Sequence, residues 1–241
     1  MHKTAIIIPA RFNSSRFPGK SLEMIDEFNV IQSVYLRAKQ VKQADIVIVA
    51  TDDSRIEKTI IDIGGRALIT NEKHINGTSR IAELAKLMSD YAYIVNLQGD
   101  EPFINPNDVD NLILRLKKSK SSILTLMKKC NIEENNNSNV VKIKTDKNGL
   151  AVLFSRVEVQ IEKDKGVYKH IGIYGFRRDV LLELVKLPLH PMEISVRLEQ
   201  LRWLENGYGI QVFETENESI GIDVPKDLIK ARAYYKLQQQ T

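Results

Sequence analysis

The sequence predicts an α/β fold in which helices cover a largely parallel sheet, and two observations support this prediction. Over the first hundred residues, short runs rich in Val and Ile alternate with longer segments whose apolar residues recur at helical spacing. Three of the short runs are followed directly by polar loops, as expected where buried parallel strands end. A fold of this class binds its ligands at that edge of the sheet.

The first half of the chain supplies the alternation. The predicted strands are residues 4–8, 46–50, 67–69 and 93–97, and the predicted helices are residues 30–41, 54–64, 79–88 and 107–118. Right-handed crossovers bring the ends of parallel strands to one edge of a sheet. We therefore expect the loops at residues 9–20, 51–53 and 98–102 to meet.

The second half is predicted to be less regular. Residues 133–139 are polar and predict an exposed loop near the boundary of a second lobe, and residues 158–166 are charged and expected to be mobile. A hairpin is predicted across the turn at Asp146 to Gly149. The remaining predictions are hairpin strands at 140–144 and 151–154, strands at 168–176 and 210–213, and helices at 178–186, 194–206 and 224–240.

The composition favours a globular protein with a small anionic ligand. The 241 residues carry a formal net charge of +4, and aromatic residues make up only 7%, so nucleic-acid binding is not expected. No apolar run approaches the ~20 residues that a membrane span needs. The N-terminus has no secretory pattern and Cys130 is the single cysteine, which predicts a cytoplasmic protein without an intramolecular disulfide.

A polar, basic loop follows the first predicted strand. It carries the cations Arg11, Arg16 and Lys20 and the hydroxyls of Ser14 and Ser15. Arg forks onto phosphate oxygens, and Lys adds a mobile point charge, so this loop suits a polyphosphate. The spacing of a P-loop is absent, and a solvated basic loop is the alternative on these residues alone.

Two carboxylates are candidates for a divalent metal. Asp100 follows the strand at 93–97, where Gly99 lets the backbone approach a ligand. Carboxylate oxygens suit Mg²⁺ shared with phosphates. Asp223 lies just before the last predicted helix and would supply the second charge. The alternative for each is an ordinary turn or helix-capping carboxylate.

One strand and one helix of the second half carry candidate substrate contacts. Strand alternation places Tyr168, His170 and Tyr174 on one face, where they can hydrogen-bond a polyol. A half-buried strand with a satisfied histidine is the alternative. On the helix, Glu199 and Gln200 face either a substrate or solvent.

Taken together, these segments resemble the 3-deoxy-manno-octulosonate (Kdo) cytidylyltransferases, also called CMP-Kdo synthetases. The resemblance runs in order over nearly the whole chain, and the combination in register is specific although each motif alone is weak. The matching segments are IPAR at 8–11, SSRFPGK at 14–20, ATD at 50–52, GT at 77–78 with Arg80, NLQGDEP at 96–102, VK at 141–142, FSR at 154–156, KHIGIY at 169–174, LEQLR at 198–202 and DVPKDL at 223–228.

The resemblance implies a fold, a reaction and an assembly. The fold is a single cytidylyltransferase domain over residues 1–241, with a mixed, mainly parallel sheet flanked by helices and a smaller β-rich lobe. Residues 1–130 and 178–241 would form the nucleotide-binding lobe, and residues 131–177 the acceptor and dimerisation lobe. The implied reaction joins CTP and a sugar acid, with Mg²⁺, to give a CMP-sugar and pyrophosphate, and the implied assembly is a homodimer.

The resemblance also assigns roles to individual residues. The anomeric hydroxyl would attack the α-phosphorus in line, and Lys20, Asp100 and Arg16 would position and neutralise the triphosphate. The residues implied to bind the nucleotide are Arg11, Ser14, Arg16, Lys20, Thr78 and Arg80. Those implied for the metal are Asp100 and Asp223, and those for the sugar acid are Gln98, Arg156, His170, Tyr174, Glu199 and Gln200.

The chain departs from the family pattern mainly in its second half. Residues 157–165 lack the usual Ile-Pro pair and form a shortened insert, Val196 stands where the family commonly has Glu, and Ser79 replaces an acidic residue. An amino-Kdo or another sugar acid is therefore an alternative acceptor. A catalytically silent nucleotide-binding regulator is the alternative from another class, although retention of both carboxylates argues against it.

Overall fold

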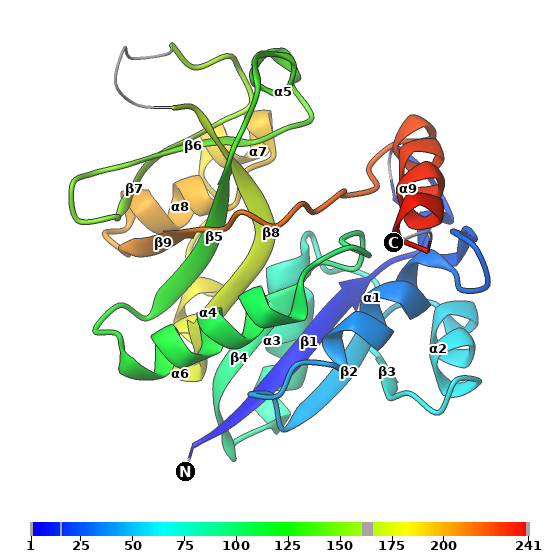
Figure 1. Cartoon of the computed structure of the whole chain (residues 1–241). Helices are drawn as coiled ribbons and strands as arrows, with labels where there is room; N and C mark the ends of the chain where they lie inside the picture. The colour runs from blue at the N-terminus through cyan, green and yellow to red at the C-terminus, as the bar shows by residue number, and fades with distance from the viewer. Residues whose placement is uncertain (1, 15, 161–165, 240–241) are drawn as a thin grey trace.

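The computed structural model describes residues 2–14, 16–160 and 166–239, in which nine strands form one sheet flanked by helices (Figure 1). The strands are β1 (Lys3–Ala10), β2 (Ile46–Thr51), β3 (Ala67–Ile69), β4 (Tyr91–Leu97), β5 (Ile123–Lys129), β6 (Lys142–Thr145), β7 (Ala151–Ser155), β8 (Tyr168–Arg177) and β9 (Ile210–Glu214). The helices are α1 (Val30–Ala38), α2 (Ser54–Ile61), α3 (Gly77–Leu87), α4 (Pro106–Lys118), α5 (Ile132–Asn136), α6 (Arg178–Leu184), α7 (Pro191–Val196), α8 (Gln200–Glu205) and α9 (Pro225–Gln238), with a short 3-10 turn at Lys20–Leu22.

The sheet is mixed, which confirms the predicted fold class. Its main order is β3-β2-β1-β4-β8-β5-β9. Strands β1 to β4 pair in parallel, whereas β8 runs antiparallel between β4 and β5. The β6–β7 hairpin joins the sheet through β8. β8 belongs to the expected acceptor lobe, but it pairs with β4 and β5 of the expected nucleotide-binding lobe. The lobe boundaries stay a prediction.

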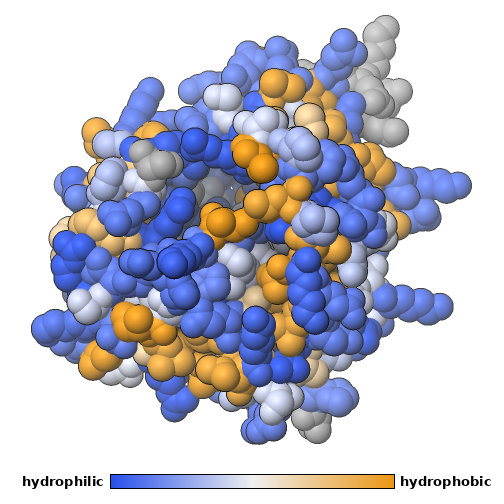
Figure 2. All heavy atoms as spheres, turned by 180° about the vertical axis from the view of Figure 1, so that it is seen from behind, coloured by the Kyte–Doolittle hydropathy of each residue, from blue (hydrophilic) through white to orange (hydrophobic). Residues whose placement is uncertain are grey.

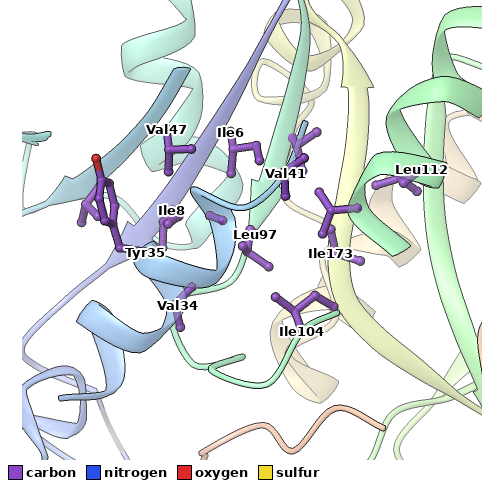
Figure 3. Packing of buried hydrophobic residues seen from close by; sticks show 14 of the residues in the cluster. Ile6, Ile8, Val34, Tyr35, Val41, Val47, Leu97, Ile104, Leu112 and Ile173 are labelled. Carbon is purple, nitrogen blue, oxygen red and sulfur yellow. The ribbon is translucent and has the colours of Figure 1, made fainter. Parts of the chain in front are cut away.

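Alternating side chains of β1 divide the core between the two faces of the sheet. Ile6 and Ile8 pack with α1, α2 and α4, while Ala5 and Ile7 pack with α3 and α6 on the opposite face. Figure 3 shows the first of these clusters, with side chains from the helices pointing toward the strands. Fully buried strands of this kind place their polar ends, and not their faces, at the ligand.

The C-terminal helix returns to the N-terminal loops. Ile222 and Leu228 pack with Ile25, Val30 and Phe103 in a third apolar cluster. This packing brings the segment before α9 beside the end of β4, where the Ile222 amide donates to the Asp100 carbonyl oxygen at 2.9 Å. Among the described residues, no helix combines the length and apolar character needed to cross a membrane.

Two predicted segments differ from the structure, and one strand was omitted. β5 is absent from the sequence prediction because a buried threonine, Thr125, interrupts its apolar run and two lysines end it. The predicted loop at 133–139 contains α5, whose capping box joins Asn131 and Glu134. The predicted continuous helix at 194–206 is wrong, because Arg197 has a left-handed backbone (φ 55°) that separates α7 from α8.

Some predictions fall on residues outside the described ranges. These are the hydroxyl of Ser15, residues 161–165 of the charged segment and the last residue of the predicted final helix, Gln240.

Candidate active site

A cleft of about 1440 Å³ opens at the carboxyl ends of β1 and β4. Residues from distant parts of the sequence line it, including the basic loop, β8, the turn between α7 and α8, and the segment before α9. Of the predicted site residues, Thr78 alone is not in the lining. The lining includes Arg11, Ser14, Arg16, Lys20, Arg80, Gln98, Asp100, Arg156, His170, Tyr174, Glu199, Gln200 and Asp223.

The two candidate metal-binding carboxylates converge on Lys20. The Lys20 Nζ donates to Asp100 Oδ2 at 2.6 Å and lies 3.5 Å from Asp223 Oδ1. It also donates to the Ile222 carbonyl oxygen at 2.8 Å. Burial of Lys20 disfavours its charge, but the two carboxylates outweigh burial, so its pKa is raised above the ordinary value.

Arg16 connects this carboxylate pair to the opposite wall of the cleft. One terminal nitrogen, Nη2, donates to Asp223 Oδ1 at 2.9 Å, and the other, Nη1, donates to Asn139 Oδ1 at 3.1 Å. Asn139 lies in the segment between α5 and β6 and was not identified from the sequence. The Arg16 side chain therefore reaches both sides of the cleft.

Close backbone contacts hold the basic loop against the end of β4. The Phe12 carbonyl oxygen accepts from the amides of Ser14 and Gly19, and Gly19 has the positive φ (76°) that this turn requires. At Gly99, an added Cβ would lie 2.7 Å from the Pro9 carbonyl oxygen. Only glycine permits this approach, and the expected meeting of the loops at 9–20 and 98–102 is observed.

Two residues implied for the nucleotide contact other protein groups. Arg80 is 3% exposed, and it donates to Asp52 Oδ2 and Thr70 Oγ1, each at 2.6 Å. Thr78 is 1% exposed, and its hydroxyl donates to Glu199 Oε1 at 2.8 Å. These bonds connect α3 to the residues that directly follow β2 and β3 and to the turn before α8, so both side chains support the cleft wall.

His170 lies on β8 and lines the cleft. Burial lowers its pKa to about 3. The Thr125 hydroxyl donates to the Ile173 carbonyl oxygen at 2.6 Å and also lies 2.9 Å from His170 Nε2. Because that hydroxyl has one proton, Nε2 must be the donor to Oγ1, which leaves His170 Nδ1 as an acceptor.

A buried polar group continues from His170. The rings of His170 and Tyr174 lie 5.1 Å apart on the predicted common face of β8, and the Tyr174 hydroxyl accepts from Gln200 Nε2. Burial raises the pKa of Tyr174 well above its ordinary value. Burial also raises the pKa of Glu199 to about 7, although the hydrogen bond from Thr78 lowers it. The position of these groups agrees with a site for a ligand rich in hydroxyls.

Arg156 is tied into the wall by backbone oxygens. Its Nε donates to the Val196 carbonyl oxygen at 2.9 Å, and Nη1 donates to the carbonyl oxygens of Ser138 and Asn139. Lys142, which has no exposed surface, donates at 2.9 Å to the Arg156 carbonyl oxygen. The segment that departs from the family pattern therefore adjoins a well-bonded arginine.

Sequence reasoning missed several cleft residues. Glu101 accepts from the Ser219 hydroxyl, and burial raises its pKa to about 7. Lys169 pairs with Glu134 and with Glu218 at 2.8 Å, and thereby joins α5 to the segment after β9. The motif NLQGDEP contains Glu101, but the hydrogen-bond partner of Glu101, Ser219, is remote in the sequence.

The donor set fits one divalent metal that also contacts phosphates. Within the described residues, no cluster of three or more His, Cys, Asp or Glu side chains has the arrangement of a metal site. Asp100 and Asp223 nevertheless direct oxygens toward the same Nζ atom of Lys20. Mg²⁺ is commonly held by one or two carboxylates, with waters and substrate phosphates completing its shell.

The chain is similar to known proteins over most of its length. The family model described as cytidylyltransferase matches residues 5–220. A 3-deoxy-manno-octulosonate cytidylyltransferase of Fusobacterium nucleatum subsp. nucleatum is 44% identical, over 95% of this chain and 96% of that protein. The enzyme of the same name from Thermodesulfovibrio yellowstonii is 45% identical, over 93% of this chain and 95% of that protein.

Solved structures are similar over almost the entire chain. The structure of CMP:2-keto-3-deoxy-manno-octonic acid synthetase complexed with CTP has a TM-score of 0.91 and 37% identity, and the match covers 98% of this chain and 99% of that one. A putative glucose-1-phosphate thymidylyltransferase from Bacillus anthracis has a TM-score of 0.71 at 15% identity, over 96% of this chain and 94% of that one. The second similarity concerns the fold alone.

Proposed function

Because this chain belongs to the cytidylyltransferase family, we propose that it joins CTP and 3-deoxy-manno-octulosonate to give CMP-Kdo and pyrophosphate. One observation carries the proposal. A single cleft has a basic loop and two converging carboxylates at one end, and buried polar groups of β8 and α8 at the other. A nucleotide triphosphate suits the first end, and a polyhydroxylated acid suits the second.

The phosphate end neutralises charge. Lys20 and Arg16 lie beside the carboxylates, and Arg11 has no hydrogen bond or ion pair with any described residue. We assign the triphosphate to these cations, because guanidinium and ammonium groups bind phosphate oxygens. Catalysis then depends on alignment of the α-phosphorus and stabilisation of the departing pyrophosphate.

The acceptor end orients hydroxyl groups. His170 Nδ1 is available to accept from a sugar hydroxyl, and the oxygen of Gln200, buried without a hydrogen-bond partner, is a second acceptor. Glu199, at its raised pKa of about 7, can accept or donate near neutral pH. We assign the sugar acid to this end together with Gln98, which also lines the cleft.

We assign Asp100 and Asp223 to one Mg²⁺ ion. When bound, the ion would reduce the negative charge of the triphosphate. Lys20 and Arg16 already share contacts with the two carboxylates and would keep them oriented. Supporting residues of this kind are required because metal sites depend on the groups that hold their ligands in place.

We infer that the enzyme is a homodimer and works in the cytoplasm. Strand β7 pairs only with β6 in the described sheet, and Val152, Leu153 and Val157 expose apolar surface along it. An unpaired edge with apolar side chains favours a protein partner. Cys130 is a free thiol, as expected for a reducing compartment.

Pyrophosphate release with CTP, MgCl₂ and Kdo tests the proposed function. We expect turnover that requires all three and a product containing CMP linked to the sugar acid. The same assay with an amino-Kdo tests the alternative acceptor. This alternative follows from the departures from the family pattern around Val196. CTP binding without pyrophosphate release from any sugar acid would contradict the proposal and favour a regulatory protein.

A further inference from the structure

Most cations of the cleft already have protein partners. Eight Lys and Arg side chains line the cleft. Five of them form described hydrogen bonds or ion pairs, namely Arg16, Lys20, Arg80, Arg156 and Lys169. The side chains of the other three form no hydrogen bond or ion pair with any described residue, and these are Arg11, Arg197 and Lys230.

The three unpaired cations lie in different parts of the cleft. Arg11 directly follows β1, at the phosphate end, and Lys230 lies on α9, beyond the carboxylate of Asp223. Arg197 lies in the turn between α7 and α8, two residues before Glu199. It is therefore the unpaired cation that adjoins the acceptor end.

The backbone of Arg197 is unusual. Within the described residues, it is the only residue other than glycine with a positive φ, and its angles (φ 55°, ψ 50°) are left-handed. Its amide and that of Leu198 both bond the Glu193 carbonyl oxygen, a helix ending at which glycine is strongly favoured. Residues other than glycine in this conformation cluster at active sites and ligand-binding regions.

Arg156 has only one terminal nitrogen left to bind an anion. Its Nε and Nη1 are occupied by backbone oxygens, which leaves Nη2. Burial lowers the pKa of Arg156 from its ordinary value, and the positive charges of Arg16 and Arg197 lower it further, against the effect of Asp223. A carboxylate near Arg156 and Arg197 would relieve this repulsion.

We propose that Arg197 binds the carboxylate of the sugar-acid acceptor, next to the Nη2 group of Arg156. Arg is suited to this task because its planar guanidinium can bind a carboxylate through two parallel hydrogen bonds. The left-handed turn orders this cation immediately before Glu199 and Gln200, so the acid group and the hydroxyls of one ligand are held by neighbouring residues. The inference rests on the proposed function and adds a residue that determines acceptor specificity.

The Arg197→Gly variant gives a sharp test, because glycine suits the left-handed turn and the variant should fold. We expect the KM for Kdo to rise about 10- to 100-fold, as for loss of a charged hydrogen-bonded contact. The KM for CTP should stay within about twofold of the unmodified enzyme. Arg197→Lys keeps the positive charge but cannot form two parallel hydrogen bonds with a carboxylate. Its KM for Kdo should lie between those of the unmodified enzyme and Arg197→Gly.

Lys230→Ala is the matched control, because it removes another unpaired cation of the same cleft. It should leave the KM for Kdo unchanged. A Kdo analogue with a carboxamide in place of the carboxylate supplies a second readout. The unmodified enzyme should strongly prefer Kdo over this analogue, and Arg197→Gly should lose most of that preference.

An unchanged KM for Kdo in Arg197→Gly, or a preserved preference for the carboxylate, would overturn the inference and leave the proposed function intact. A raised KM in Lys230→Ala alone would assign the carboxylate to α9 and would also overturn it. If the unmodified enzyme released no pyrophosphate with Kdo, the proposed function itself would fail.

Discussion

At the residue scale, the carboxylates of Asp100 and Asp223 are held together by positive charge. Lys20 contacts both, and Arg16 contacts Asp223. Without these cations, two carboxylates this close would repel each other. The contacts with Lys20 and Arg16 orient both carboxylates toward the same part of the cleft.

Asp100→Asn should lose most turnover and keep the fold. The substitution preserves size and removes the charge that we assign to Mg²⁺, so we expect kcat to fall about 100-fold or more. Pyrophosphate release measures the loss, and thermal unfolding verifies the fold. Asp90→Asn, at an exposed carboxylate, should retain full activity. Near-normal kcat in Asp100→Asn would remove the metal role of that residue.

Glu199 links the stability of the protein to pH. Its pKa is about 7 in the folded state, because burial disfavours the carboxylate, and near 4.5 when unfolded. The folded state therefore holds more protons between these values, so this residue lowers stability as pH rises from about 4.5 to 7. Above about pH 7, the carboxylate is ionised in both the folded and the unfolded state, so the destabilisation by the buried charge no longer changes with pH.

The stability of the Glu199→Gln variant relative to the unmodified protein should increase as pH rises. Gln keeps an oxygen that can accept from Thr78 and removes the ionisation. Relative to the unmodified protein, its free energy of unfolding should increase between pH 5 and pH 8 by roughly 3 kcal/mol at most. Urea unfolding at several pH values measures this difference. A difference that does not vary with pH would show that Glu199 has no raised pKa.

At the element scale, the site depends on the close approach of β1 and β4 at their carboxyl ends. Gly99 lies against the Pro9 carbonyl oxygen, and Gly77 at the start of α3 lies against Pro9 and Gln98. Backbone atoms cannot move aside as flexible side chains can. The position of Asp100 relative to the basic loop is therefore fixed by the absence of a side chain at Gly99.

Gly99→Ala should weaken both folding and CTP binding. The added Cβ would lie 2.7 Å from a backbone oxygen, so we expect a loss of about 1–3 kcal/mol in the free energy of unfolding. Gly209→Ala is the control, since its Cβ would make an ordinary 3.6 Å contact with Leu150. Denaturant unfolding and CTP titration measure the two effects. Equal stability of the two variants would contradict the prediction.

Local patterns predicted most of the elements, and long-range contacts explain those that they did not. The first four strands have apolar runs that need no partner to be recognised. β5 is harder, because Thr125 becomes acceptable in the core only through its bonds with His170 and Ile173. The break between α7 and α8 has no glycine or proline signal, because an arginine occupies the left-handed position.

At the scale of the whole molecule, β7 forms an exposed edge of the sheet. β7 has a single strand partner, and its Leu153 is 37% exposed and Val152 is 59% exposed. Figure 2 shows patches of hydrophobic side chains among the hydrophilic ones on the face seen from behind. A partner that covers β7 would pair its free backbone groups and bury the exposed side chains of Val152 and Leu153.

Leu153→Asp should therefore weaken the proposed homodimer. A buried, unpaired carboxylate in an interface is costly, so the mass measured by light scattering should shift toward that of one chain. Leu87→Asp is the control, because Leu87 is 82% exposed at the end of α3. Dimers of unchanged stability in Leu153→Asp would place the interface elsewhere, and a single-chain mass for the unmodified protein would contradict the dimer itself.

The candidate site could be assembled from sequence only in part. The polar residues after β1 and β4 were expected to meet, and Lys20 and Asp100 are in contact. The contact of Arg16 with Asn139 depends on how the cleft walls approach each other, which no local spacing encodes. Arg197 was missed for a related reason, because its place in the cleft follows from a backbone angle.

The antiparallel strand β8 has a consequence for biosynthesis. β4 ends at Leu97, but its neighbour in the sheet begins only at Tyr168, and β9 must follow before β5 gains its second partner. A chain emerging from the ribosome thus presents an unpaired strand edge until most of it has been made. Asp223 comes later still. The order of synthesis therefore makes the cleft one of the last parts of the molecule to be completed.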